Sequence, residues 1–231
     1  MEHSFFTGIG TREQNEDVIL IEQVSQNNKL FLVVDGMGGY EKGEVAAKLV
    51  ADNIVTYLRT IQKIDFSNVQ KAVNKANLAV KQYNEANQIT SGATLGGVVF
   101  SGNSAICFWL GDVKIYYIKN NKLVQESQSH SFLNEMSDSD FSKSPENFKR
   151  YGHIVTRSVS GKREKTNLDF FKIDHLSAQD SFIICSDGVH NTMTVQHMNL
   201  LLSTNTNTSV IEDYLNTHAK DNFSLINIIK K

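Results

Sequence analysis

The chain has 231 residues, of which 40% are hydrophobic and 21% charged, a composition typical of globular proteins with enough apolar material for a core. Lys and Arg together number 23 against 25 for Asp and Glu, so the formal net charge of −2 gives no reason to expect nucleic acid or an anionic membrane as a partner. The usual size of domains and the lack of an obvious linker predict a single domain over residues 1–231.

The two cysteines, Cys107 and Cys185, lie within apolar runs and are predicted to be buried thiols, which fits a reducing compartment. No apolar stretch approaches the roughly 18 residues that a membrane-spanning helix needs. The N-terminal sequence MEHSFFTGIG has neither a basic segment nor an apolar signal core. We therefore expect a soluble, cytoplasmic protein.

The first predicted element in chain order is a β-strand at residues 29–34, a continuous apolar run. Two amphipathic helices are predicted next, at 41–62 and 67–86, because apolar residues recur on one helical face, and Ser67 is the expected N-cap of the second. A third helix is predicted at 209–219. Short β-rich runs predict the remaining strands, at residues 94–101, 104–110, 114–119, 122–126, 170–173, 181–185 and 223–229.

The order of these blocks predicts antiparallel sheets with helices packed outside them. Asn120-Asn121 lies between two of the strands and predicts a hairpin, because Asn tolerates the left-handed backbone of tight turns. The polar stretch 127–150 interrupts the pattern and holds the only proline, Pro145. It is too long for an ordinary connection, so we expect a mobile flap at about residues 127–155.

Three apolar runs lead directly into an Asp next to a Gly: LFLVVDGMGG with Asp35, CFWLGD with Asp112 and SFIICSDGV with Asp187. A single Asp at the end of a buried strand usually caps a turn. Three such junctions favour a shared site instead, to which Glu16-Asp17 and Asp221 would add further acids. Several carboxylates that meet at one edge of a core cannot all ionise without a cation between them.

The available ligands limit which cation would fit. They are carboxylate and backbone oxygens, and no His or Cys pair has the spacing of a zinc site. Oxygen ligands suit Mg²⁺ or Mn²⁺, and two such ions about 3.5–4 Å apart would clamp a phosphoryl group and activate a bridging water. Arg12, four residues before Glu16, is either a bidentate ligand for phosphate oxygens or a solvated surface arginine.

Taken together, these motifs resemble the metal-dependent protein Ser/Thr phosphatases of the PP2C (PPM) family, particularly its compact bacterial members. An isolated Asp-Gly pair is common, but eight pieces in the family's order over nearly the whole chain make the resemblance specific. The pieces are Arg12-Glu13-Gln14-Asn15-Glu16-Asp17, Asp35-Gly36-Met37-Gly38-Gly39, Ser91-Gly92-Ala93-Thr94, Gly111-Asp112, His130-Ser131, Thr156-Arg157-Ser158-Val159, Ser186-Asp187-Gly188-Val189 and Asp221-Asn222.

The resemblance implies an α+β fold in which two packed antiparallel β-sheets are flanked by α-helices, the α-β-β-α sandwich of that family. It also implies a metal site. Asp35 would bridge two metal ions, and the carbonyl of Gly36 would bind the first of them. Asp187 and Asp221 would hold the second ion, and Arg12 would bind the substrate phosphate.

Further acidic residues would support this site. By the same resemblance, Glu16 and Asp17 would act mostly through metal-bound waters. Asp112, together with Asp187, matches the place where bacterial members take a third, weaker ion. The implied cofactors are therefore two, or three, Mn²⁺ or Mg²⁺ ions.

The chain departs from the family pattern at several positions. Met37 stands where animal members often have a His that could act as a general acid, although bacterial members also carry Met there. Val113-Lys114 replaces the Ser-Arg of the usual Gly-Asp-Ser-Arg motif, and we expect Lys114 to keep a positive charge. His130, in the predicted flap, either faces the substrate or is solvated.

The sequence therefore predicts an enzyme that hydrolyses phosphoserine and phosphothreonine in proteins, with Arg12, Asp35 and Asp187 as catalytic residues. Its partners would be a phosphorylated protein and the Ser/Thr kinase whose action it reverses, and family analogy favours a monomer. One alternative is a catalytically weak module of the same fold that binds phosphoproteins, suggested by the residues after Asp112. Another two-metal phosphoesterase, such as a nuclease, is disfavoured by the neutral charge balance.

Overall fold

The structure is a computed structural model, and it describes residues 1–37, 42–136, 144, 146, 150–151, 154–162, 166–204 and 208–231. Two expectations fall partly outside these residues. The predicted flap at 127–155 is described up to residue 136 and then only in short pieces, and Gly38 and Gly39 of one motif are not described.

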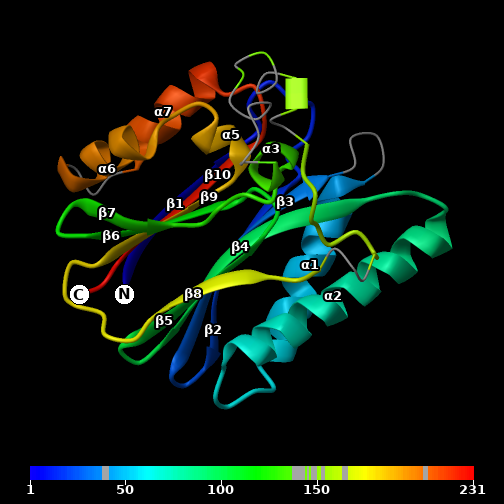
Figure 1. The fold of residues 1–231 in the computed structure, drawn as a ribbon, viewed down its shortest axis with the longest axis horizontal. Coiled ribbons are helices and arrows are strands. Elements are labelled where there is room, and N and C mark those ends of the chain that lie inside the picture. Colours follow the sequence, from blue (N-terminus) through cyan, green and yellow to red (C-terminus); the bar gives the residue numbers. More distant parts are fainter. Residues whose placement is uncertain are drawn as a thin grey trace.

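The described strands form two five-stranded sheets in which neighbouring strands run antiparallel (Figure 1). Sheet A has the order β1-β10-β9-β6-β7, with bounds Glu2–Gly8, Phe223–Ile229, Ser181–Cys185, Lys114–Lys119 and Lys122–Glu126. Sheet B has the order β2-β3-β4-β5-β8, with bounds Asp17–Ser25, Asn28–Met37, Gly92–Ser101, Ser104–Leu110 and Asp169–Ile173.

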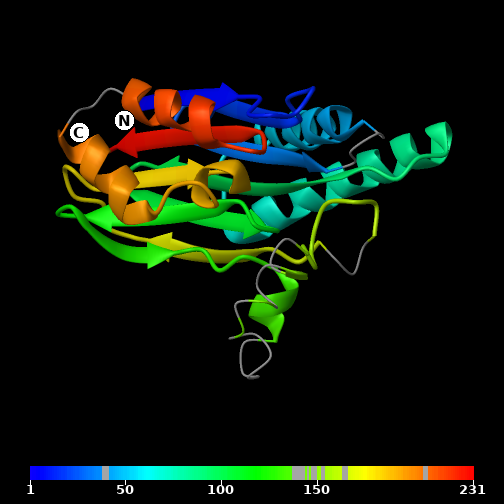
Figure 2. The same cartoon turned by 90° about the horizontal axis from the view of Figure 1, so that it is seen from above.

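Helices cover the outer face of each sheet, and the turned view shows the successive layers (Figure 2). Helices α1 (Gly43–Leu58) and α2 (Phe66–Asn87) pack on sheet B, and α6 (Val195–Thr204) and α7 (Ser209–His218) pack on sheet A. The short helices are α3 (Phe132–Glu135), which projects from one side of the layers in Figure 2, and α5 (Asp187–His190). The architecture is therefore the predicted α-β-β-α sandwich.

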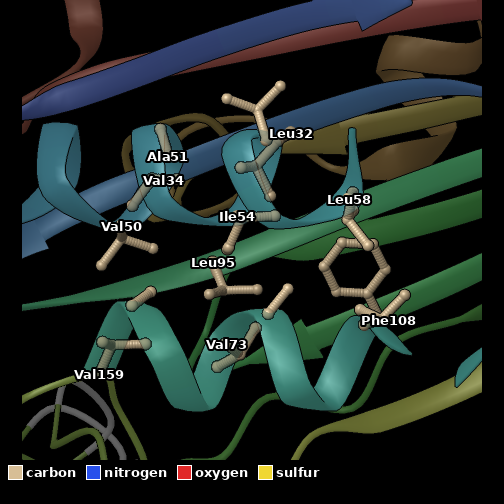
Figure 3. Close-up of a cluster of buried hydrophobic side chains, with 14 of the residues drawn as sticks. Leu32, Val34, Val50, Ala51, Ile54, Leu58, Val73, Leu95, Phe108 and Val159 are labelled. Atoms are coloured by element: carbon tan, nitrogen blue, oxygen red, sulfur yellow. The ribbon is translucent and has the colours of Figure 1, made fainter. Parts of the chain in front are cut away.

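Three buried clusters hold the layers together. Figure 3 shows the first, where Ile54 of α1 and Val73 of α2 converge on Leu95 of sheet B. Between the sheets, the rings of Phe100 and Phe182 make an edge contact with centroids 5.2 Å apart. The third cluster lies between sheet A and helices α6 and α7. Burial of each large apolar side chain contributes about 1.5–3 kcal/mol, so these clusters fix the strand ends that carry the acidic residues.

Most predicted elements are confirmed, and the β6–β7 hairpin turns at Asn120 and Asn121 with φ of 51° and 59°. The predicted N-cap of α2 is wrong. Asp65 caps this helix, because its carboxylate accepts a hydrogen bond from the backbone N–H of Asn68 at 2.8 Å and the Asn68 side chain accepts one from the Asp65 N–H. Within the described residues, none of the helices is both long and apolar enough to cross a lipid bilayer.

Candidate metal centre

Strand register places two of the predicted acids side by side in sheet B. Asp17 at the start of β2 lies opposite Asp35 on β3, and Asp35 lies opposite Thr94 on β4. Directly opposite residues of antiparallel strands present their side chains on the same face of the sheet. The fully buried run before Asp35 holds this strand in the core, so the carboxylate is delivered by a rigid backbone.

Sheet A brings two more acids to the same place. Asp187 follows the end of β9, and Asp221 precedes the start of β10, the strand antiparallel to it. A cavity of about 560 Å³ lies where these strand ends meet. Except for Asp17, all the predicted site residues line it: Arg12, Glu16, Asp35, Gly36, Asp112, Asp187 and Asp221.

Asp17 is buried behind the cavity and connects the two sheets. Its Oδ2 accepts a hydrogen bond from the Ser186 hydroxyl at 2.8 Å, and the Ser186 oxygen accepts one from the Ser224 N–H at 2.9 Å. The other carboxylate oxygen, Oδ1, is buried and has no hydrogen-bond partner among the described residues. A buried carboxylate oxygen without a hydrogen-bond partner raises the free energy of the folded state. Its surroundings therefore favour a cation or water as its partner.

Arg12 and Asp221 form an ion pair at the rim of the cavity. Nη2 of Arg12 donates to Oδ2 of Asp221 at 2.6 Å, while Oδ1 of Asp221 accepts the backbone N–H of Asn222 at 2.9 Å. The hydrogen bond that Arg12 donates to Asp221, reinforced by the negative charge of Asp221, raises the pKa of the Arg12 guanidinium. The Arg12 side chain is 56% exposed, so a phosphate entering from solvent can reach it.

Asn222 fixes the loop that carries Arg12 and Glu16. Its Nδ2 donates to the carbonyls of Ile9 at 3.0 Å and Gln14 at 2.9 Å. Its Oδ1 accepts the backbone N–H of Glu16 at 2.9 Å. Because Asn222 is buried, these three bonds hold the loop in register with the start of β10.

Close backbone approach explains the glycine after Asp35. The N–H of Gly36 donates to the carbonyl of Glu16 at 3.2 Å, and a Cβ at position 36 would lie 2.5 Å from the carbonyl oxygen of Gly43. A Cβ at Gly43 would in turn lie 2.6 Å from Oε2 of Glu16. Any side chain at either position would displace Glu16 or the start of α1.

The half-buried His190 connects the loop of Asp112 to the helix that begins at Asp187. Nε2 of His190, in helix α5, donates to the carbonyl oxygen of Asp112 at 2.9 Å. Burial lowers the pKa of His190 to about 4, so the ring is neutral near pH 7. Helix α5 begins at Asp187, whose Oδ2 accepts a hydrogen bond from Nδ2 of Asn191 at 3.3 Å. Asp112 and Asp187 are thereby held at one side of the cavity.

Crowding raises the pKa of these carboxyl groups. For Asp35 the causes are burial and then repulsion from Asp17 and Asp187. Burial raises the pKa of Asp17 to about 6, and burial with repulsion from Asp112 and Asp221 raises that of Asp187 to about 7. The pKa of Asp112 is also raised, chiefly by burial. The protein's own groups therefore leave much of the negative charge of the site uncompensated.

The donor set fits Mg²⁺ or Mn²⁺. It consists of carboxylate and backbone oxygens, it includes the partnerless Oδ1 of Asp17, and it gathers acids whose pKa is raised. Among the described acidic, His and Cys side chains, no three are already arranged around one point as metal ligands. An ion held by several of these acids would therefore require side-chain movement.

The predicted alternatives for His130 are both wrong, since the side chain is neither solvated nor turned toward the cavity. It is 4% exposed, its Nδ1 accepts the N–H of Gly111 at 3.0 Å, and its Nε2 lies 3.1 Å from Oδ2 of Asp169. Its ring stacks beside Trp109 with centroids 6.4 Å apart. Burial lowers its pKa, so His130 is a neutral link between the flap and the loop of Asp112.

Lys114, which stands in place of the family's Arg, donates from Nζ to the carbonyl of Ser127 at 2.8 Å. Its positive charge opposes the effect of burial on the pKa of Asp112, as expected from the sequence. Val113 is fully buried between the sheets. Lys114 thus contacts the start of the flap, and Val113 lies in the core between the sheets.

Several residues that shape this site could not be assigned a role from the sequence. Thr94 and Asn222 stood in recognised motifs, but only the fold shows that Thr94 neighbours Asp35 and that Asn222 anchors the Arg12 loop. Ser186 also stood in a recognised motif, beside Asp187, and His190 stood in none. Their partners, Asp17 and the carbonyl of Asp112, are far away in the sequence.

Comparison with known proteins points to the same family that the sequence motifs resemble. Residues 9–225 match the family described as Protein phosphatase 2C. The serine/threonine phosphatase stp of Listeria monocytogenes is 25% identical over 217 residues, which cover 90% of this chain and 85% of that protein. The match extends over nearly the whole chain, so it includes both sheets.

Solved structures share the fold. The S. agalactiae serine/threonine phosphatase has a TM-score of 0.86 at 19% identity, covering 100% of this chain and 99% of that one. The catalytic domain of the phosphatase PstP in complex with two manganese ions has a TM-score of 0.83 at 21% identity, covering 100% and 98%. With a family match over residues 9–225, the chain belongs to the protein phosphatase 2C family.

Proposed function

We propose that this chain is a metal-dependent protein serine/threonine phosphatase that hydrolyses phosphoserine and phosphothreonine with water. The observation that carries the proposal is the shared cavity: acids from both sheets, Asp35, Asp187 and Asp221 among them, line it together with Arg12. Because both sheets supply these residues, we propose that residues 1–231 work as one catalytic domain.

The proposed cofactors are two Mn²⁺ or Mg²⁺ ions, with a third, weaker one. When bound, such ions neutralise charge on the phosphoryl group and make a water nucleophilic near neutral pH. Asp35 and the carbonyl of Gly36 would hold the first ion, and Asp35, Asp187 and Asp221 the second. Asp112, together with Asp187, would hold the third ion.

The acids Glu16 and Asp17 are proposed to orient water. Asp17 is suited to this because the Ser186 hydroxyl, itself held by the Ser224 N–H, fixes Oδ2 from the sheet A side, while Oδ1 stays available. Glu16 lines the cavity. Its carboxylate occupies the space that a Cβ at Gly43 would fill. Neither side chain needs to touch the substrate in this role.

Arg12 is proposed to bind the phosphate of the substrate. Its guanidinium has a planar fork that matches two phosphate oxygens, and it lies at the exposed rim of the cavity. Met37 also lines the cavity and has no proton to give. The oxygen of the leaving serine or threonine would therefore take its proton from water.

Hydrolysis of a phosphothreonine peptide by the purified chain tests this function. We expect turnover with Mn²⁺ or Mg²⁺ and none in EDTA. Tight peptide binding without turnover in the presence of Mn²⁺ would favour the alternative, a phosphoprotein-binding module. Faster hydrolysis of DNA or RNA than of the peptide would favour a different two-metal phosphoesterase.

The proposal also covers the origin of the substrate, the cell compartment and the oligomeric state. The substrate would be a phosphorylated protein made by a Ser/Thr kinase, and the enzyme would act as a cytoplasmic monomer. The balanced net charge of −2 and the two buried free cysteines support this setting. Light scattering of the purified chain should give a mass close to 25.9 kDa, and twice that mass would contradict the monomer.

A further inference from the structure

A groove follows the free edge of sheet B. The described strands of this sheet end at β2, and β10 of sheet A packs over β2 and β3. The edge strand of sheet A, β1, pairs with β10 and lies on the same side of the sandwich. A cavity of about 530 Å³ opens next to β2 on this side, and we call it the β2 slot.

Three elements form the β2 slot. Its lining residues are 18–22 of β2, His3 and Phe5 of β1, and Lys48, Ala51 and Asp52 of α1. Successive side chains of a strand point to opposite faces of the sheet. A hollow that touches five consecutive residues of β2 therefore follows the edge of this strand, with β1 as one wall and α1 as the other. This is the place where a further strand of sheet B would lie.

The backbone of β2 offers hydrogen-bonding groups to the slot. The carbonyl of Glu16 accepts the N–H of Gly36 from β3 at 3.2 Å, and residues of an antiparallel ladder alternate between facing the partner strand and facing away from it. Ile19 and Ile21 are an odd number of residues from Glu16, so their N–H and C=O groups point away from β3. No described strand pairs with β2 on that side.

This edge lacks the protection that the other described edge strands have. Charged side chains on an edge strand discourage pairing with another chain. By contrast, residues 18–21 of β2 form an uninterrupted apolar run, and all four are half-buried. The charged residues of the other edges are Glu2 in β1, Lys122 and Glu126 in β7, and Asp169 and Lys172 in β8.

The charges around the slot are balanced within the chain. Nζ of Lys48 lies 3.3 Å from Oδ2 of Asp52, and Nη2 of Arg59 lies 2.8 Å from Oε2 of Glu22. Burial lowers the pKa of His3, so its ring is neutral near pH 7. A segment that enters the slot meets apolar side chains and paired charges, which suits an uncharged, apolar occupant.

We infer that the β2 slot binds an extended, uncharged segment of a partner protein, which joins sheet B as an edge strand. Its backbone would pair with the outward N–H and C=O groups of Ile19 and Ile21. Apolar side chains at alternate positions would contact Phe5, which is 55% exposed, on one face and Ala51 on the other. Because β2 begins at Asp17, the partner would be held beside the cavity of the metal centre.

Binding in the slot is independent of the proposed phosphatase activity. The slot and the cavity of the metal centre have no lining residue in common. A peptide-binding experiment on the metal-free chain therefore tests this inference alone, and its failure would leave the proposed function unaffected.

The test is a titration of the whole ¹⁵N-labelled chain with a neutral, acetylated and amidated heptapeptide in which Thr and Val alternate. We expect a dissociation constant on the order of 1 mM and about tenfold slower hydrogen exchange at the amides of Ile19 and Ile21. The amides of Val18 and Leu20, which face β3, should change little. The same peptide N-methylated at its valines lacks these backbone donors and should not bind.

Three variants make the result specific. Phe5→Lys removes an apolar wall and should weaken binding about tenfold. Ile21→Pro removes one outward N–H, a change that an edge strand tolerates, and should abolish the slower exchange at Ile19. Val124→Lys, at a 57% exposed position of edge strand β7, is the matched control for Phe5→Lys and should bind like the parent chain.

The inference is wrong if the peptide leaves exchange at Ile19 and Ile21 unchanged, or if the parent chain, Phe5→Lys and Ile21→Pro bind it equally. Slower exchange that appears without peptide as the chain concentration rises would show that a second copy occupies the slot. That result would also overturn the inference of a separate partner.

Discussion

Nη2 of Arg12 lies 2.6 Å from Oδ2 of Asp221, so the group proposed to bind phosphate and a group proposed to bind metal neutralise each other. A divalent cation at Asp221 competes with the guanidinium for the same oxygen. Its binding would release Arg12 toward the cavity, where a phosphate can accept its hydrogen bonds. With these proposed roles, metal binding and substrate binding would be coupled through this pair.

Arg12→Ala should therefore have two opposite effects. Mn²⁺ should bind several-fold more tightly, because the competing positive charge is gone, and KM for a phosphothreonine peptide should rise tenfold or more. The second estimate follows from the roughly 1.5–3 kcal/mol typical of hydrogen bonds to charged groups. Calorimetry and steady-state kinetics measure both, and Arg12→Lys, which keeps the charge without the fork, should be intermediate. An unchanged KM would contradict the role of Arg12.

Asn222→Ala should loosen the loop that carries Arg12. The substitution removes the hydrogen bonds that the Asn222 side chain makes with the N–H of Glu16 and with the carbonyls of Ile9 and Gln14, and each such bond contributes about 0.5–1.5 kcal/mol. We expect a lower melting temperature, a higher KM for the peptide and faster hydrogen exchange at the Glu16 amide. Exposed Asn216→Ala is the control. Unaltered exchange at Glu16 would show that Asn222 does not hold the loop.

The crowded carboxyl groups predict a pH dependence for the metal-free protein. Folding raises the pKa of Asp187 to about 7 and that of Asp17 to about 6, so the folded state disfavours their ionised forms. Their unfavourable contribution is absent below the unfolded pKa near 4 and grows as the pH rises to about 7.

Asp187→Asn should thus raise the melting temperature in EDTA, by more at pH 7 than at pH 4.5, and should reduce the stabilisation that added Mn²⁺ gives the parent chain. Differential scanning calorimetry at both pH values measures this difference. The prediction fails if the variant is equally or less stable than the parent chain at pH 7 in EDTA.

The start of α2 gives a separate test of local structure. Asp65→Ala removes the capping carboxylate and should cost about 1 kcal/mol, which lowers the melting temperature by about 2–4 °C in a chain of this size. Ser67→Ala lies inside the first turn and should change stability by less than about 0.5 kcal/mol. The reverse order of the two effects would restore Ser67 as the cap.

Sequence patterns predicted the buried part of the fold well and its periphery less well. Strands β5, β6, β7, β9 and β10 have the predicted bounds, and the bounds of β3, β4 and β8 differ by a few residues at most. Strand β1 was missed because it lies at the edge of sheet A, where only Phe6 of its residues is buried. Strand β2 is also an edge strand, and most of its residues are half-buried, which weakens the period-two pattern.

The acids of the site were predictable because each follows or precedes an apolar run, which is a local signal. The contacts that organise them are not local. Arg12 and Asp221 are 209 positions apart, and the Asn222 bond to Ile9 spans 213. These segments come together through the pairing of β1 with β10. The hydrophobic periodicity of the sequence does not reveal which strands pair.

The most direct test of the account is the turnover of a phosphothreonine peptide by the parent chain and by Asp35→Asn, each titrated with Mn²⁺. Because burial, with repulsion from neighbouring acids, raises the pKa of Asp35, the neutral amide should not unfold the chain, and calorimetry can verify this. We expect Mn²⁺-dependent turnover in the parent chain, at least a hundredfold less in Asp35→Asn, and weaker Mn²⁺ binding by the variant. Turnover that survives in EDTA, or that is equal in a folded Asp35→Asn, would contradict it.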